Sequence, residues 1–155
     1  MNLTCSKRVY PLMLASQIGN LEMVEFLLEK GAKIIRTDAH GRTALIYAVM
    51  NGHLSVASLL LSKGIEFDRG DKSNNTPLHY ACAYGYYEMI PLLIEAGANP
   101  NLVNDWNYSP LLVGLIKGHM RCVRVLLENP DVDVNIRDDK GRSFLISLIM
   151  KLDPD

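Results

Sequence analysis

The residues of this 155-residue chain that could carry out chemistry are four histidines, three cysteines and a group of acidic side chains. Histidines could act as general acids or bases, thiolates as nucleophiles, and closely spaced sets of either as metal ligands. The histidines are His40, His53, His79 and His119, and the cysteines are Cys5, Cys82 and Cys122. Their wide spacing matches neither a zinc motif nor a disulfide framework. We therefore expect no catalytic residue, no metal site and no cofactor.

The acidic group and the rest of the sequence also lack the motifs of known active sites. Asp131, Asp133, Asp138 and Asp139 have neither the regular spacing nor the glycine of a calcium loop. The sequence contains no glycine-rich phosphate loop and no nucleophile elbow. We therefore expect that the chain is not an enzyme and has no small-molecule substrate.

Composition and charge narrow the class of protein further. Lys and Arg total 16 against 17 Asp and Glu, a net charge of -1 that argues against nucleic acid as a partner. No run of about 18 apolar residues occurs, so we expect no membrane interaction, and the N-terminus does not resemble a signal peptide. These features predict a cytoplasmic or nuclear protein.

An interval of 33 residues recurs along the sequence and indicates which elements position its side chains. Glycines recur every 33 residues, at Gly19, Gly52, Gly85 and Gly118, and in a second register at Gly31, Gly64 and Gly97. Thr76-Pro77 and Ser109-Pro110 are typical of helix starts, and glycine is typical of the residue just past a helix end. Each unit therefore predicts two helices, the first ending at glycines such as Gly85 and the second closing at glycines such as Gly64.

These units resemble ankyrin repeats. The resemblance is carried by Asn75-Thr76-Pro77-Leu78-His79-Tyr80-Ala81-Cys82, by Gly85, and by Leu92-Leu93-Ile94-Glu95-Ala96-Gly97-Ala98-Asn99-Pro100-Asn101. It implies an all-α solenoid of helix-turn-helix units joined by hairpin-like loops. It also implies that His79 links neighbouring loops through its ring nitrogens, and that His53 and His119 are structural.

We expect a single domain over residues 1–155, with units at about 5–37, 38–70, 71–103 and 104–137 and a partial unit at 138–152. The last segment is apolar on nearly all sides, and a helix of that kind requires burial. Its apolar residues are Phe144, Leu145, Ile146, Leu148, Ile149, Met150 and Leu152. We therefore expect that the chain belongs to a longer protein, or that this end pairs with a second copy.

The resemblance implies that a partner binds along a concave groove made by the hairpin tips and the first helices. We expect Trp106, Tyr108 and Tyr84 to be the anchors, because exposed aromatic side chains often dominate binding energy; the alternative is that Trp106 folds back over the neighbouring tip. Basic residues at the groove would steer an acidic or phosphorylated partner. The basic residues are Arg42, Lys72, Lys117 and Arg142, and His40 and Met50 complete the expected contact set.

The predicted function is therefore that of a protein-protein interaction module that binds a protein or peptide. Three alternatives remain open at this stage. The chain could be a non-catalytic targeting or substrate-recognition module of a larger enzyme, or a structural spacer. Its asparagines Asn101 and Asn135 also resemble sites that asparaginyl hydroxylases modify in this family.

Overall fold

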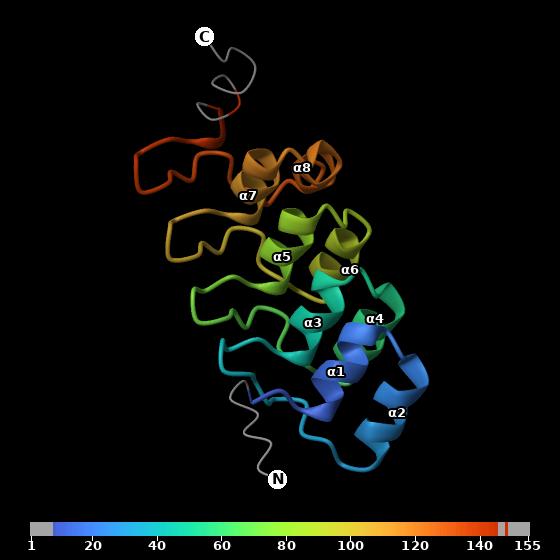
Figure 1. Ribbon diagram of the computed structural model, residues 1–155. Helices are drawn as coiled ribbons and strands as arrows, with labels where there is room; N and C mark the ends of the chain where they lie inside the picture. Colours follow the sequence, from blue (N-terminus) through green and yellow to red (C-terminus); the bar gives the residue numbers. More distant parts are fainter. Residues whose placement is uncertain (1–7, 146–147, 149–155) are drawn as a thin grey trace.

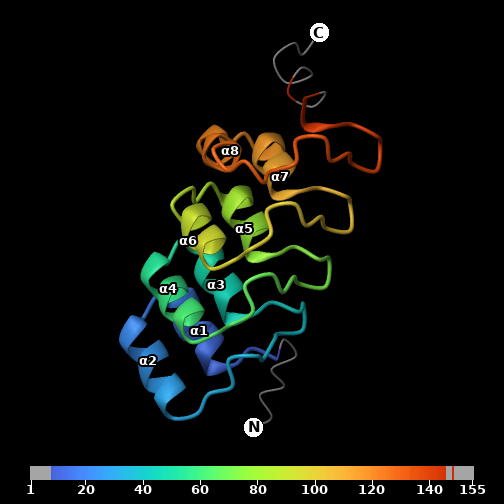
Figure 2. The same cartoon turned by 180° about the vertical axis from the view of Figure 1, so that it is seen from behind.

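The computed structural model describes residues 8–145 and residue 148, and within them the chain forms four stacked helix pairs (Figure 1). The pairs are α1 (Pro11–Ile18) with α2 (Leu21–Glu29), α3 (Ala44–Met50) with α4 (Leu54–Ser62), α5 (Pro77–Tyr84) with α6 (Met89–Glu95), and α7 (Pro110–Lys117) with α8 (Met120–Leu127). The loops between pairs project to one side of the stack, as both views show (Figures 1 and 2). The predicted all-α solenoid of helix-turn-helix units is confirmed.

Hydroxyl side chains begin three of the four first helices, as the sequence predicts. The hydroxyl oxygens of Thr43, Thr76 and Ser109 accept hydrogen bonds from the backbone N–H three residues later, at 3.2, 3.5 and 3.3 Å. Each bond satisfies a backbone donor that has no partner within the helix. At α1, Tyr10 precedes the proline without a side-chain cap. The hydroxyl and proline positions therefore locate the helix starts correctly.

Glycine ends the first helices for two separate reasons. Gly19 and Gly85 have φ angles of 80° and 81°, in the left-handed region that other residues rarely adopt. A Cβ atom at Gly19 would also collide with the ring of His53, and one at Gly85 would lie 2.7 Å from the ring of His119. Each glycine thus turns the chain and leaves room for a histidine of the next unit.

The core is one continuous apolar layer between the helices. The first helices pack on one another in the order α1, α3, α5, α7, and each also packs on the second helix of its own pair. Residues 44–49 of α3 are all buried, whereas α4 buries only Val56, Ala57 and Leu60. The first helices therefore form the centre of the stack, and the second helices cover one side of it. No helix among the described residues is long and apolar enough to cross a bilayer.

Helix α6 starts later than its counterparts, a feature that the 33-residue period does not predict. Helix α4 begins two residues after Gly52, whereas α6 begins at Met89, four residues after Gly85. Pro91 lies in α6, where Ser58 occupies the equivalent position of α4. Proline lacks a backbone N–H and is tolerated only in the first turn of a helix. The late start of α6 keeps Pro91 within that first turn.

Two apolar residues of the C-terminal segment, Phe144 and Leu148, pack with the core. Phe144 is buried at 5% exposure, Leu145 is 53% exposed, and Leu148 is partly buried against the core. Ile146, Ile149, Met150 and Leu152, on which the expected all-round apolar helix also depends, lie outside the described residues, as does Cys5. The expectation of a longer parent protein or a second copy at this end therefore remains a prediction.

The stacked core gives a direct test of stability. Leu60 is fully buried in α4, and replacing it with alanine would leave a cavity between units, so we expect Leu60→Ala to lower the free energy of unfolding by about 2–5 kcal/mol. Leu54 in the same helix is 41% exposed, and Leu54→Ala should cost less than about 1 kcal/mol. Urea denaturation followed by circular dichroism measures the unfolding free energy of both variants. Equal losses in the two variants would contradict the burial of Leu60 in the core.

Candidate protein-binding surface

The loop face is the surface formed by the loop tips, residues 38–42, 71–75, 104–108 and 138–142, together with the adjoining first helices. Each tip begins with Asp or Asn, whose side chain holds the turn. Asp38 Oδ1 accepts hydrogen bonds from the backbone N–H groups of His40 and Arg42, both at 2.8 Å. The same pair of bonds occurs at Asp71, Asn104 and Asp138. The tips are therefore fixed in shape before any partner binds.

Neighbouring tips are also joined to one another. The N–H of Lys72 donates to the carbonyl of His40 at 2.8 Å, and the N–H of Asp105 donates to the carbonyl of Ser73 at 3.1 Å. The side chain of Asn74 donates to Asp105 at 2.6 Å. The tips at residues 38–42, 71–75 and 104–108 thus form a continuous ledge, which presents backbone and side chains at a regular spacing.

Two of the predicted basic residues are engaged within the chain. The guanidinium groups of Arg42 and Arg142 lie 2.7 Å from the carboxylates of Asp38 and Asp138, which are themselves buried. Burial would raise the pKa of Asp38, but hydrogen bonds from Arg42, Tyr47 and His40 outweigh it and lower that pKa below its usual value. Arg42 and Arg142 therefore neutralise buried carboxylates, which reduces the positive charge that they offer to a partner.

His79 connects the third unit to the tip at residues 104–108, as the resemblance implies. Its Nδ1 accepts a hydrogen bond from the backbone N–H of Thr76 at 3.1 Å, so the proton resides on Nε2, which donates to the carbonyl of Tyr108 at 2.8 Å. His53 Nε2 and His119 Nε2 similarly contact the carbonyls of Gln17 and Ala83, at 2.9 and 3.1 Å. These three histidines have structural roles, and His40 is exposed at a tip.

An aromatic hollow of about 360 Å³ opens on the loop face between the third and fourth units. It brings together four of the nine predicted binding residues: Tyr84, Trp106, Tyr108 and Lys117. Trp106 is 49% exposed and Tyr84 is 50% exposed, whereas Tyr108 is half-buried. The remaining lining residues are Asn75, His79, Tyr80, Ala83, Asn104 and Val113.

The hollow lies where the fourth unit lacks a tyrosine that the second and third units have. Tyr47 and Tyr80 occupy equivalent positions in the second and third units, and their hydroxyls donate to the tip carboxylates of Asp38 and Asp71, at 2.9 and 2.6 Å. The fourth unit has Val113 at this position, whose side chain is shorter and cannot donate. Val113 and Asn104 both line the hollow. Sequence reasoning missed both Val113 and Tyr80, although alignment of the units at 33 residues would have found them.

Tyr84 is held at the edge of the hollow by other rings. Its ring is stacked on those of Tyr80 and Tyr86, with centroids 6.3 and 6.5 Å apart and interplanar angles of 10° and 22°. Such contacts restrict an exposed ring without covering it, so less conformational entropy is lost when a partner binds. The geometry therefore favours Tyr84 as a rigid contact.

The remaining predicted residues lie outside the aromatic hollow. Lys72 and His40 are exposed at adjacent tips, and Met50 is half-buried at the end of α3. Cys82 and Cys122 are buried free thiols in the core. Among the described residues, no group of His, Cys, Asp and Glu has the arrangement of a metal site.

Comparison with known proteins gives one family. A family model described as ankyrin repeats (3 copies) matches residues 1–71 and residues 68–138. These ranges include all four helix pairs and all the tips of the loop face except the last. No curated protein sequence matches the chain.

The buried link at His79 predicts a pH dependence of stability. Burial lowers the pKa of His79 from 6.5 to about 4, although the bond to Tyr108 and the charge of Asp71 act in the opposite direction. The unfolded chain therefore binds the proton first, so stability is complete above about pH 6.5 and falls as the pH decreases towards 4. We expect a loss of about 2 kcal/mol between pH 7.5 and pH 5, measured by urea denaturation.

Two histidine variants separate this effect from other titrations. In His79→Gln the amide can still donate to the carbonyl of Tyr108 but does not titrate. The decrease in unfolding free energy between pH 7.5 and pH 5 should therefore be smaller than in the wild-type chain by most of the expected loss of about 2 kcal/mol. In His40→Gln, which changes an exposed histidine, the loss should remain. An unchanged pH dependence in His79→Gln would contradict the buried neutral imidazole.

Proposed function

Because the chain belongs to the ankyrin repeat family, we propose that it binds a partner protein or peptide through its loop face. Ankyrin repeats are generally protein-protein interaction modules, and stacked repeats create extended surfaces for this purpose. The same contacts would serve a free-standing module or a targeting module of a larger enzyme. The observation that carries the proposal is the aromatic hollow, where a ledge of fixed tips meets half-exposed aromatic rings.

Trp106 and Tyr84 are the proposed anchors. Each leaves about half of its surface in water, so a partner that covered them would remove a large apolar area from solvent. Tyr108 supports them from a half-buried position, and its carbonyl is fixed by His79. Binding would therefore require little rearrangement of the chain, which favours affinity.

Lys72 and Lys117 are the proposed electrostatic contacts. Both are exposed on the loop face, and among the described residues neither takes part in an ion pair. Lys117 lines the aromatic hollow itself. A partner segment with an acidic or phosphorylated group next to an apolar side chain would contact both the lysines and the aromatic hollow. Arg42 and Arg142 would add hydrogen bonds from groups that are already held in place by Asp38 and Asp138.

The anchors are tested by comparing partner binding to the wild-type chain and to a Trp106→Ala, Tyr84→Ala double variant. Immobilised chains are incubated with cell lysate, captured proteins are quantified by mass spectrometry, and the affinity of a captured protein is then measured by calorimetry. Because hot-spot aromatic residues contribute about 2 kcal/mol or more each, we expect the double variant to bind at least about 100-fold more weakly.

Phe26 provides the matched control, because it is an aromatic residue of α2 that is 51% exposed and lies outside the loop face. The variant Phe26→Ala should capture the same partner with unchanged affinity. Circular dichroism should show equal helix content in all three chains. If the double variant retains the partner, the loop face is not the binding site.

A second test addresses the charge of the partner. Exposed lysines accelerate association with an acidic segment, so we expect Lys72→Gln, Lys117→Gln to reduce the association rate constant about threefold to tenfold at low salt. The difference should shrink at about 0.5 M salt, where charges are screened. The control is Lys33→Gln, Lys63→Gln, which removes two exposed lysines outside the loop face. Equal rates for both double variants would rule out an acidic partner.

A further inference from the structure

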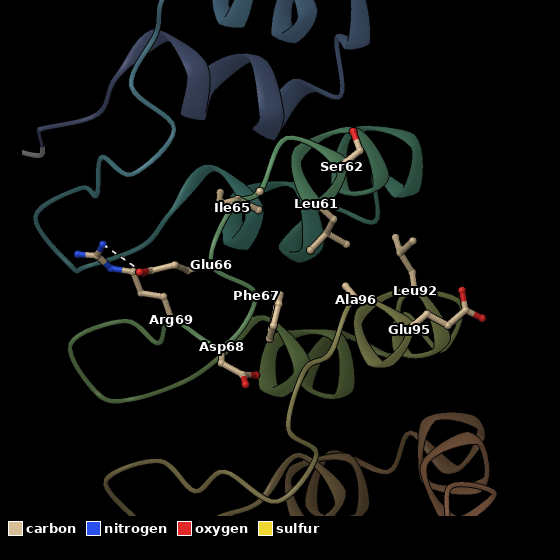
Figure 3. A pocket seen from close by; sticks show the side chains of 11 residues that line it. Leu61, Ser62, Ile65, Glu66, Phe67, Asp68, Arg69, Leu92, Glu95 and Ala96 are labelled. Atoms are coloured by element: carbon tan, nitrogen blue, oxygen red, sulfur yellow. Dashed lines mark ion pairs between the residues drawn. The ribbon is translucent and has the colours of Figure 1, made fainter.

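A second hollow lies between the helix pairs and shares no residue with the aromatic hollow (Figure 3). It is about 680 Å³ in volume and is formed by the C-terminal ends of α4 and α6 and by the loop that follows α4. We call it the outer hollow. It therefore offers a binding position that the proposed contacts on the loop face do not use.

The floor of the outer hollow is apolar. Leu61 and Leu92 project from α4 and α6 into the space beside Phe67 (Figure 3). Phe67 packs closely over Gly97, where an added Cβ atom would lie 3.1 Å from the end of the ring. The equivalent position of the third unit is Pro100, so the large ring is a feature of this unit. Ile65 and Ala96 complete the floor.

The lining is also acidic. Glu66, Asp68 and Glu95 contribute three carboxylates, against the single guanidinium group of Arg69. Arg69 lies 3.6 Å from Glu66, and both side chains are largely exposed, so this pair is weak. The charge in the outer hollow is therefore negative overall, opposite to the lysines of the loop face.

Asp68 occupies a position at which the next unit has asparagine. In the third unit, Asn101 donates to the carbonyl of Asp131 and accepts from the N–H of Asp133, both at 2.7 Å. Asp68 accepts from the N–H of Asn99 alone, with both oxygens at 3.1 Å, and a carboxylate cannot donate. Burial raises the pKa of Asp68, and the bond from Asn99 only partly opposes this. An asparagine could accept the same bond, as Asn101 does from the N–H of Asp133, so the loop structure does not require a carboxylate at this position.

We propose that the outer hollow binds an arginine side chain of a partner protein, together with an aliphatic residue beside it. A guanidinium group forms two parallel hydrogen bonds with a carboxylate and stacks on aromatic rings, so Asp68 would receive the head and Phe67 the planar face. The aliphatic neighbour would cover Leu61 and Leu92. Glu66 and Glu95 would attract the positive charge from the rim. The partner segment is thus basic, unlike the acidic segment proposed for the loop face.

The test uses the whole chain, labelled with nitrogen-15, and an acetylated, amidated peptide of sequence Ala-Leu-Arg-Leu-Ala. We expect saturable changes of the backbone amide shifts in residues 64–69 and 92–97. The variant Asp68→Asn introduces the residue type found at Asn101, so it should fold normally, and it should bind the peptide about tenfold more weakly because a charge-assisted pair is lost. A peptide with glutamate in place of arginine should not bind.

Two controls separate this site from other effects. Asp131→Asn removes an exposed carboxylate of the next loop and should leave the affinity unchanged. The Trp106→Ala, Tyr84→Ala double variant should also bind the peptide normally, so failure of the loop face would not affect this result. If Asp68→Asn does not fold, Glu95→Gln on the exposed side of α6 should weaken binding about threefold. The proposal would be overturned if the peptide caused no saturable shifts in residues 64–69. It would also be overturned if Asp68→Asn, or Glu95→Gln where Asp68→Asn does not fold, bound the peptide as tightly as the wild-type chain.

Discussion

Each helix pair that the structure describes packs its apolar surface against a neighbouring unit, and the stack depends on these contacts. Residues 44–49 of α3 are buried because α1 and α5 pack on either side of that helix. Stacked repeats gain stability mainly from such interfaces between neighbours. The contacts that set the spacing between units, such as the bond from His79 to the carbonyl of Tyr108, therefore act on the fold and on the loop face at the same time.

The loop face is rigid for a reason that lies in the tips. A tip that begins with Asp or Asn satisfies two of its own backbone N–H groups with one side-chain oxygen, and the next tip is joined by backbone bonds such as that from Lys72 to His40. Side chains between these fixed points, including Trp106, project from backbone that is already ordered. The entropic cost of binding then falls mainly on the partner.

Sequence reasoning predicted the parts of the structure that follow from local rules. Hydroxyl caps such as Thr76 and helix-ending glycines such as Gly85 depend on a few neighbouring residues, so their types alone located the helices. The ion pair between Arg42 and Asp38 was not predicted in this way. It depends on the burial of the Asp38 carboxylate, which results from folding and not from residue type alone. Tyr84, Trp106 and Tyr108 were grouped by the family resemblance. The hollow between them is also lined by Val113, which becomes notable only when the units are aligned and a tyrosine is found at its position in the preceding unit.

The exceptions to the repeat are more informative about function than the repeat itself. Each buried bond from a tyrosine hydroxyl to a tip carboxylate contributes about 0.5–1.5 kcal/mol, and the fourth unit forgoes that bond at Val113. In the second unit, Asp68 likewise cannot make the donated hydrogen bond that Asn101 makes in the third unit. Each of these departures borders a hollow, one aromatic beside Lys117 and the other apolar beside carboxylates. The binding surfaces that we propose therefore lie where the residue types of neighbouring units differ.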